Sequence, residues 1–396
     1  MRFLLFTFLL FLHVSYAKVP EKFSNSKYCI GCHIQKGVDW KTTWHSKSNS
    51  KKNPMYKSFL KYISSVTYKS IGNIEVNCGQ CHSPKMGVKQ VDFAYDMSKA
   101  FGIETDETKE VEDAMHNSTS DDGISCIICH NIDKIKHTQE INKRGFEAVE
   151  FGSPEIMRGP YKESHRTSYH KMQSRDYFTK DVNKLCLVCH YGYKDGNIYE
   201  YATGIEYESS NSSTKCVECH MGDIKKSIIA PNIVGNVKAV ERDTRRHLFK
   251  GVRNSNIVKN FIKVSVIKNG SKITVSLKNT TPHKFPTGFT GREVDISVIY
   301  KNGSKIISKQ TKKINTLYVD KNNKETISYV AAKMVFDKRL KPHEEKKYIF
   351  NIDNKANNAK IEIKYRLIKS SLVPILEIKD KIFTKQYDIY SSSLKI

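Results

Sequence analysis

The stretch Cys126-Ile127-Ile128-Cys129-His130 carries the pattern that decides the fold, because Cys-x-x-Cys-His occurs five times in this chain of 396 residues. The other copies begin at Cys29, Cys78, Cys186 and Cys216, and the five together use all ten cysteines. The pattern is the attachment signature of c-type haem. A lone copy could be a redox dithiol or part of a zinc site, but five copies that account for every cysteine leave little room for that interpretation.

Two thiols of each motif form thioethers with the haem vinyl groups, and the adjacent histidine supplies the proximal iron ligand. We therefore expect five covalently bound c-type haems. The predicted haem-attaching residues are Cys29, Cys32, Cys78, Cys81, Cys126, Cys129, Cys186, Cys189, Cys216 and Cys219. The predicted proximal iron ligands are His33, His82, His130, His190 and His220.

The first 17 residues have the composition of a secretory signal peptide. Arg2 precedes the largely apolar run from Phe3 to Leu12, and small residues stand at Ser15 and Ala17 before Lys18. The run is too short for a spanning helix and ends in a cleavage-site pattern; an uncleaved membrane anchor is the alternative. Export and cytochrome c maturation together predict the bacterial periplasm or the cell exterior. Since no cysteine is left over, no disulfide framework is expected there.

The chain is strongly basic, with 66 Lys and Arg against 41 Asp and Glu and a formal net charge of +25. The propionates of five haems would offset up to about ten of these charges. The remaining basic surface could steer an acidic redox partner, an anionic substrate or a lipid surface, or it could reflect only a lysine-rich composition. Nucleic acid is excluded as a partner because the chain is exported and has no base-reading motif. The expected partners are redox proteins, with a peripheral contact to a membrane quinol-oxidising complex left open.

Two regions of different texture follow the signal. Residues 18–254 hold all five motifs and short helical patterns, such as Pro54 to Ser64 and Thr108 to His116, and we expect a pentahaem domain of short helices and loops. From residue 255 the pattern alternates between apolar and polar. Phe261 to Ile267 and Ile273 to Leu277 flank an Asn-Gly turn, which predicts a β-hairpin.

Further alternating runs without any cysteine predict an all-β, immunoglobulin-like sandwich over residues 255–396. The stretch from Ser370 to Ile396 could add edge strands or a closing helix. The predicted fold class is therefore an α+β multidomain chain, with a mainly helical and loop cytochrome domain before an all-β sandwich. The additional strand candidates are Val294 to Tyr300, Ser304 to Ser308, Ile327 to Val335, Lys347 to Ile352 and Lys360 to Arg366.

Eight histidines remain as candidates for the second axial ligands, once the five proximal ones and His13 in the signal are set aside. That number is enough for bis-histidine ligation of every haem. His137 and His343 are interpreted as solvated, and Met86 and Met221, which follow motifs closely, as packing residues. The eight are His45, His116, His137, His165, His170, His247, His283 and His343.

Four patterns around these histidines resemble the multihaem cytochromes grouped with cytochrome c-554. After the first motif comes Trp40 and then Trp44-His45, and Asp122-Gly123-Ile124-Ser125 runs into the third motif. Gly159-Pro160-Tyr161 precedes His165, and Arg246-His247-Leu248-Phe249-Lys250-Gly251 follows the last motif.

A fifth pattern lies in the expected sandwich. Many relatives have Gly-His-x-Phe-Pro-Thr-Gly there, and this chain has Pro282-His283-Lys284-Phe285-Pro286-Thr287-Gly288, with Pro282 where glycine is usual. Pro286 fixes one backbone angle and Gly288 permits a tight turn, so the loop can hold His283 toward the haem half; an ordinary loop with a surface histidine is the alternative. The predicted distal ligands are His45, His116, His165, His247 and His283. His170 competes with His165, and a solvated side chain is the alternative for His116.

The resemblance fixes a class and leaves the reaction open. Electron transfer through bis-histidine haems needs nothing beyond what the chain contains. A reductase or oxidase of a small nitrogen or sulfur compound would need one haem with an open iron position. No Cys-x-x-Cys-Lys occurs, and Arg166, Tyr169 and His170 are the residues that could line such a site. A head-to-tail filament is a third possibility.

Overall fold

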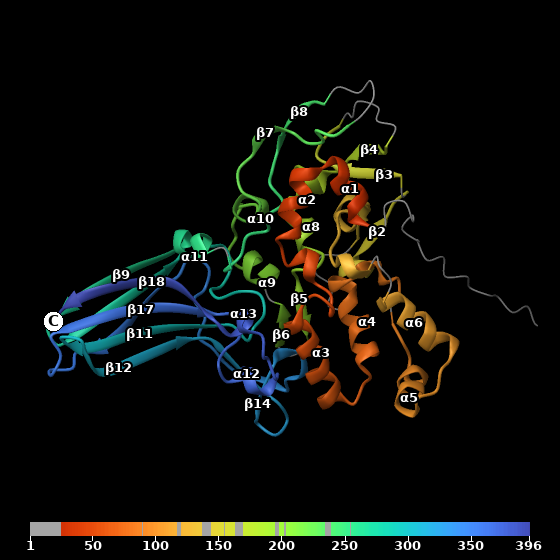
Figure 1. The fold of residues 1–396 in the computed structure, drawn as a ribbon. Helices are drawn as coiled ribbons and strands as arrows, with labels where there is room; N and C mark the ends of the chain where they lie inside the picture. Colours follow the sequence, from red (N-terminus) through yellow and green to blue (C-terminus); the bar gives the residue numbers. More distant parts are fainter. Residues whose placement is uncertain are drawn as a thin grey trace, which may run out of the picture.

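The computed structural model describes residues 25–88, 90–116, 120–136, 144–153, 155–162, 169–194, 198–201, 203–233, 239–253 and 255–396 (Figure 1). The predicted signal peptide, His137 and His165 lie outside these residues. Within them, no helix has both the length and the apolar character needed to cross a bilayer.

The first half consists of short helices joined by loops. Both predicted helices are confirmed: the one that begins at Pro54 is α3, and the one that ends at His116 is α6. Asn53 caps α3 by accepting a hydrogen bond from the Tyr56 backbone N–H, and Pro54 occupies its first turn, as helix starts favour. The helices are α1 (Ser26–Cys32), α2 (Ile34–Lys41), α3 (Pro54–Thr67), α4 (Ile71–His82), α5 (Phe93–Phe101), α6 (Asp106–His116), α7 (Cys126–His130), α8 (Val182–Leu187), α9 (Thr203–Glu208) and α10 (Cys216–His220).

Four small strand pairs lie among these helices, and the sequence did not predict them. Each strand has three or four residues, too few for an alternating pattern to stand out. Three pairs are antiparallel and β3 with β4 is parallel. The pairs are β1 (Ile132–Ile135) with β2 (Val149–Phe151), β3 (Ile156–Gly159) with β4 (Lys171–Ser174), β5 (Gly192–Lys194) with β6 (Ile198–Tyr201), and β7 (Lys225–Ile228) with β8 (Glu241–Thr244).

The second half is all β apart from short helices, as predicted. After α11 (Ser255–Phe261), antiparallel sheets form in the orders β16-β10-β9, β12-β11-β17-β18 and β14-β13-β15. The strands are β9 (Ile262–Asn269), β10 (Lys272–Asn279), β11 (Glu293–Asn302), β12 (Lys305–Ile314), β13 (Thr316–Val319), β14 (Glu325–Thr326), β15 (Lys333–Asp337), β16 (Glu345–Asn351), β17 (Asn358–Arg366) and β18 (Gln386–Lys395).

Alternation along the strands of the first two sheets places one face of each in a common core, while the β14-β13-β15 sheet has a small cluster of its own around Tyr318. Ile273, Val275 and Leu277 of β10 are fully buried, and every second residue of β17 is buried. The Asn269-Gly270 turn predicted between β9 and β10 is present, with Gly270 at a φ of +54°. The predicted order of a helical half before an all-β half is confirmed, while the boundary at residue 254 stays a prediction.

One strand prediction is wrong over most of its length. The run from Ile327 to Val335 begins with a 3₁₀ turn over Ser328–Val330, and β15 starts only at Lys333. Buried Ile327 and the fully buried Ser328 side chain, whose hydroxyl accepts from Thr290, fix that turn. The ambiguous C-terminal stretch contains both alternatives: the short helices α12 (Leu372–Ile375) and α13 (Lys381–Thr384), then edge strand β18.

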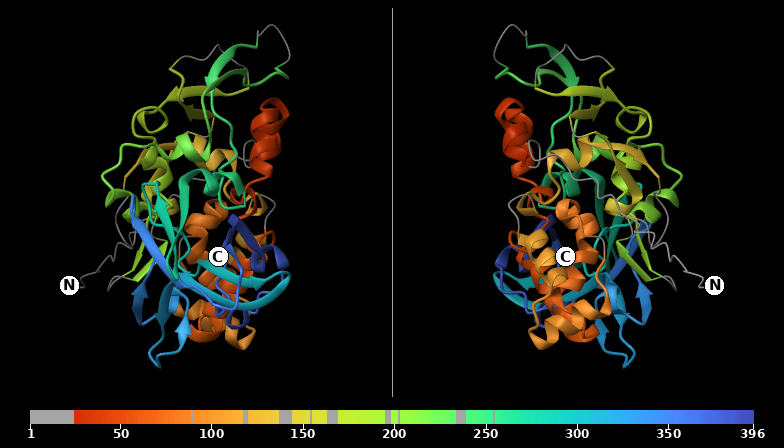
Figure 2. Two further views of the ribbon diagram at one scale, coloured as in Figure 1. Left: turned by 90° about the vertical axis from the view of Figure 1, so that its left-hand side faces the viewer. Right: turned by 90° about the vertical axis from the view of Figure 1, so that its right-hand side faces the viewer.

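Helix α3 joins the two halves (Figure 2). Phe59 of α3 is buried within the sandwich core, with its ring 4.9 Å from that of Phe289 at 74°, an edge-to-face contact. Tyr62, one turn later, shares a 2.6 Å hydrogen bond with the Thr326 hydroxyl. Trp44 packs its ring 5.2 Å from Phe383 in α13. The halves therefore share one hydrophobic core.

Replacing Phe59 with alanine should lower the free energy of unfolding by about 3–5 kcal/mol, since a buried ring is lost and its cavity cannot collapse fully. Urea unfolding followed by circular dichroism measures the change. Phe101→Ala is the matched control, because that ring is 70% exposed and its loss should cost less than about 0.5 kcal/mol. Equal losses in both variants would contradict the shared core.

Candidate functional site

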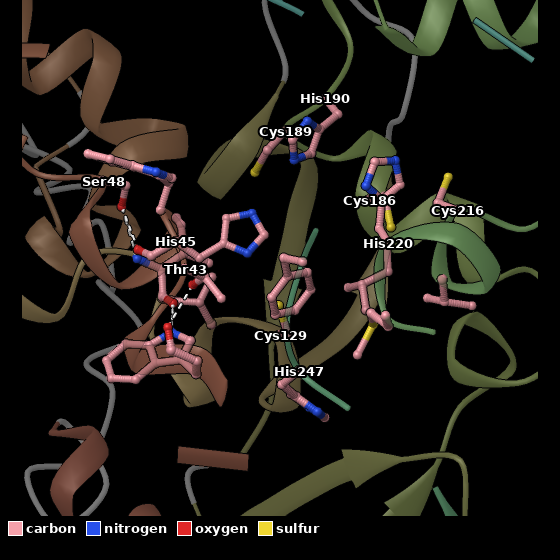
Figure 3. Close-up of a pocket in the computed structure, with 18 of the residues that line it drawn as sticks. Thr43, His45, Ser48, Cys129, Cys186, Cys189, His190, Cys216, His220 and His247 are labelled. Atoms are coloured by element: carbon pink, nitrogen blue, oxygen red, sulfur yellow. Dashed lines mark hydrogen bonds between the residues drawn. The ribbon is translucent and has the colours of Figure 1, made fainter. Parts of the chain in front are cut away.

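A cavity of about 1970 Å³ runs through the helical half and reaches the sandwich. Ordinary small-molecule pockets measure about 300–1,000 Å³, so this one has room for several large cofactors. All ten motif cysteines and all five motif histidines line it, together with His45, His170, His247 and His283. Figure 3 shows Cys129, Cys186, Cys189 and Cys216 around this space with His45, His190 and His220.

Each motif lies on or at the end of a short helix. We number the motifs 1 to 5 in chain order. Motif 1 begins in the last turn of α1, and motif 2 forms the end of α4. Motifs 3 and 5 are the helices α7 and α10 themselves. Positions three apart on a helix lie on the same face, so one turn presents both thiols to the cavity. The following histidine then stands at the helix end, beside the two thiols, as haem attachment requires.

Four of the motif histidines are oriented by a backbone carbonyl that interacts with Nδ1. A neutral ring that donates Nδ1–H keeps Nε2 free as the metal-binding nitrogen, and such outer partners fix ring orientation at metal sites. The pairs are His33 with Ile229 O at 3.2 Å, His82 with Ser48 O at 3.0 Å, His130 with Arg158 O at 2.6 Å and His220 with Lys250 O at 2.6 Å.

Three motif histidines each have a second cavity-lining histidine nearby, at nearly the same ring-to-ring distance. A metal–imidazole bond of about 2.0–2.1 Å, with the ring centre about 1.1 Å further out, puts two rings on opposite sides of one metal about 6.3 Å apart. The centroid distances are 6.3 Å for His33 and His170, 6.1 Å for His45 and His190, and 6.2 Å for His130 and His247. These spacings fit one iron between each pair.

Burial keeps these rings neutral, the form that binds metals. It lowers the pKa of His45 to about 4 and the pKa values of His190 and His247 to about 3, and neighbouring histidines add to each shift. Burial also lowers the pKa of His283, and His220 contributes in the same direction. His220 and His283 are therefore close neighbours.

The motifs meet through their thiols. Cys29 lies within hydrogen-bonding reach of Cys126, Cys81 of Cys189, and Cys186 of Cys216. Motif 4 thus touches motifs 2 and 5, while motif 1 touches motif 3. Cofactors held at such neighbouring sites would lie side by side.

The pattern Asp122-Gly123-Ile124 before motif 3 has a structural cause. Gly123 has a φ of +58°, and a Cβ there would lie 2.6 Å from the His45 carbonyl oxygen. That carbonyl accepts a 2.9 Å hydrogen bond from the Ile124 backbone N–H, and the Asp122 carboxylate accepts one from Ser26 at the start of α1. The pattern therefore packs motif 3 against both His45 and α1.

The segment before His247 is held by a buried carboxylate. Asp39 of α2 is 1% exposed and accepts hydrogen bonds from Arg246 Nε at 2.7 Å and from the His247 backbone N–H at 3.0 Å. Burial opposes ionisation, but these donors outweigh it, so the pKa of Asp39 lies below its usual value. This anchor aims His247 at the cavity.

The loop that carries His283 is clamped to the helical half by charges that the sequence did not reveal. Glu206 of α9, 3% exposed, accepts from Arg339, from Thr287 and, at 3.1 Å, from the Lys284 backbone N–H. Arg339 is also bidentate to Asp337 at 2.8 and 2.9 Å. Since Glu206 and Arg339 stand 133 residues apart, no local pattern could have indicated the pair.

The remaining candidates fall outside this arrangement. His116 ends α6 with its side chain 59% exposed, 4.0 Å from Glu112, and does not line the cavity. Met86 is buried in a cluster with Val76, Tyr95 and Val111, as a packing residue would be. His343 is exposed in a turn, at a φ of +59°.

Replacing Asp337 with asparagine should reduce the stability that the protein loses as the pH falls. Burial would raise the pKa of Asp337, but Arg339 and Lys284 lower it to about 2, against about 3.9 in an unfolded chain. A depressed pKa stabilises the native state above about pH 4, and about 2 kcal/mol is lost as the pH falls to about 2.

Urea unfolding at pH 5 and at pH 2.5 measures this difference. The wild type should lose more stability between the two values than Asp337→Asn. Asp176→Asn is the control, because its ion pair with Lys180 is largely exposed and should contribute little. A variant that loses as much stability as the wild type would contradict the role of the Asp337 carboxylate.

Comparisons with known proteins concern the first three motifs and the fold. Residues 28–131 match the family described as cytochrome c554 and c-prime. The structure resembles a penta-heme cytochrome c552 from Thermochromatium tepidum with a TM-score of 0.70 and 17% identity, over 94% of this chain and 98% of that one. The E. coli curli protein CsgC is matched over 26% of the chain, with a TM-score of only 0.15. No curated protein matches by sequence.

Haem fits the residues that line the cavity. Ten thiols in five Cys-x-x-Cys-His motifs face it, and their histidines are oriented for metal binding. The fold of nearly the whole chain is that of a multihaem cytochrome. With the family match over the first motifs, these findings make the chain a multihaem c-type cytochrome that resembles the cytochrome c554 family.

Proposed function

We propose that the protein is an exported carrier with five haems that passes electrons between redox proteins of the periplasm or cell surface. The observation that carries the proposal is the set of paired imidazoles at 6.1–6.3 Å, because two strong ligands on each iron suit electron transfer. Haem iron supplies the one-electron chemistry, and the chain supplies ligands, orientation and spacing.

Three of the proposed ligand pairs follow the ring spacings, and the fourth joins two further cavity histidines, His220 and His283. The four pairs are His33 with His170, His190 with His45, His130 with His247, and His220 with His283. In this assignment His170 takes the role for which His165 competed, and the exposed His116 takes none. The neighbouring thiols of motifs 1 and 3, 2 and 4, and 4 and 5 support close cofactor spacing, which lets electrons move without substrate chemistry.

Replacing His283 with alanine should change one haem and leave the others as they are. Loss of one strong ligand should convert that haem to high spin or shift its potential, since axial ligation sets both. Optical and EPR spectra of the purified oxidised protein measure this. His343→Ala, in an exposed turn of the same half, is the control and should match the wild type. Wild-type spectra in His283→Ala would remove this ligand from the scheme.

A reductase or oxidase of a small nitrogen or sulfur compound is the second candidate, and one observation favours it. His82 lines the cavity, but within the described residues no histidine ring faces it as in the three pairs above. Its ring instead stacks on Tyr56 at 4.3 Å and 4°. If no residue outside the described ranges ligates an iron bound to His82, that iron keeps one position open for a substrate.

EPR of the fully oxidised protein, quantified against total haem, separates the two candidates. Five haems per chain are expected, with about one in five high-spin if the His82 iron is open. Nitrite, hydroxylamine and sulfite are then the first compounds to add. Five low-spin haems would exclude an open site and leave the carrier alone.

A further inference from the structure

Helix α5 presents an apolar face to solvent. Phe93, Met97 and Phe101 follow one another at intervals of four, so they lie along one side of the helix. Their exposed fractions are 76%, 37% and 70%. A helix of this size normally turns such a stripe toward a core. Here the core-facing side of α5 is a different one.

The opposite side of α5 is anchored to the start of α4. Tyr95 is fully buried against Gly72, and Asp96 accepts hydrogen bonds from the Ser70 backbone and hydroxyl at 3.0 and 2.6 Å. Asn73 donates a further bond of 2.7 Å to the same carboxylate. The exposed stripe is therefore fixed in its outward direction by packing on its other side.

The stripe continues onto neighbouring segments. Tyr68 and Ile71 flank the Ser70 that binds Asp96, and they are 93% and 45% exposed. Ile103, just after α5, is 56% exposed. Figure 1 shows α5 and the end of α3 at the same end of the molecule. We call the six residues the apolar end: Tyr68, Ile71, Phe93, Met97, Phe101 and Ile103.

Scattered exposed apolar residues are ordinary, but a contiguous group is typical of an interaction site. The segment that carries α5 and α6 has the opposite charge to the rest of the chain, although Lys69 stands beside Tyr68. Residues 92–113 contain eight acidic residues and two lysines, a net charge of −6, whereas the whole chain carries +25. Both lysines are held by local ion pairs, Lys99 with Glu112 and Lys109 with Glu104.

Helix α4 connects the apolar end to a haem-binding motif. Helix α4 carries Cys78, Cys81 and His82 at its end. Val76 of α4 packs with Tyr95 and Val111 from α5 and α6 in one buried cluster. A protein docked on the apolar end would therefore contact the layer that packs on α4, the helix whose last residues form motif 2.

We propose that the apolar end and the acidic residues of 92–113 form the docking surface for a basic redox protein with an apolar contact centre. An apolar centre within a charged rim is the usual anatomy of a specific interface, and opposite charge favours encounter. The acidic rim opposes binding to anionic lipid. This inference rests on the proposed electron-transfer function, because the surface would be one place where electrons enter or leave the protein.

The test uses the mature haem-loaded protein and two probes, a strongly basic monohaem cytochrome c and an acidic flavodoxin. The variant is Phe93→Ser with Phe101→Ser. The matched control is Ile267→Ser with Ile306→Ser, since those side chains are 61% and 60% exposed on the sandwich. Calorimetry measures binding of the oxidised probe, and stopped-flow mixing measures the second-order rate of electron exchange.

Wild type should bind the basic probe, and the rate should fall about tenfold as salt rises from about 20 to 200 mM. The phenylalanine variant should lose about tenfold in affinity and rate toward the basic probe and nothing toward the acidic one. The sandwich control should match the wild type. Glu110→Gln with Asp113→Asn should reduce the salt dependence.

Unchanged binding in the phenylalanine variant overturns the inference, as does an equal loss in the sandwich control. Sedimentation velocity gives a further test: wild-type assemblies that the variant loses would assign the surface to a second copy of the chain. Variant-sensitive binding to phosphatidylglycerol vesicles would assign it to lipid. Phe-dependent binding without electron exchange would leave the docking surface intact and reject the carrier function. Electron exchange without Phe-dependent binding would leave the carrier function intact and reject the docking surface.

Discussion

The hydrogen bond between a motif histidine and a backbone carbonyl constrains most of the helical half. His33 depends on the carbonyl of Ile229, 196 residues later, and His82 on that of Ser48 from another loop. Each bond fixes a ring and also holds a distant loop beside a motif. The cavity keeps its shape because its lining is connected in this way, and the facing histidines reach nearly equal spacing as a result.

The two halves are stabilised differently. The sandwich has a continuous core in which Ile273, Val298 and Ile361 are fully buried. The helical half has only small clusters around a large cavity, so bound cofactors would supply much of its apolar interior. Where the halves meet, Phe59 extends the sandwich core and Glu206 anchors the loop of His283. The second half thus completes the cavity of the first.

Local patterns predicted much of this arrangement. The five motifs indicated every attachment residue, and alternation indicated most sandwich strands, because both depend on neighbours in sequence. The 3₁₀ turn at Ser328–Val330 was missed since its cause is tertiary: a hydroxyl bond to Thr290. Pairings such as Glu206 with Arg339, or His33 with His170, join distant segments and leave no trace in spacing. The sequence also could not reveal that α6 leaves His116 in solvent.

The junction at α3 has a consequence for the order in which the chain can acquire its structure. Tyr62 and its partner Thr326 are separated by 264 residues, so their contact closes a very long loop of the chain. Until the sandwich is synthesised, Phe59 has no core to enter and its ring stays in water. Closing so long a loop carries an entropic cost that only the completed sandwich offsets. Helix α3 is therefore fully packed only once the sandwich has folded.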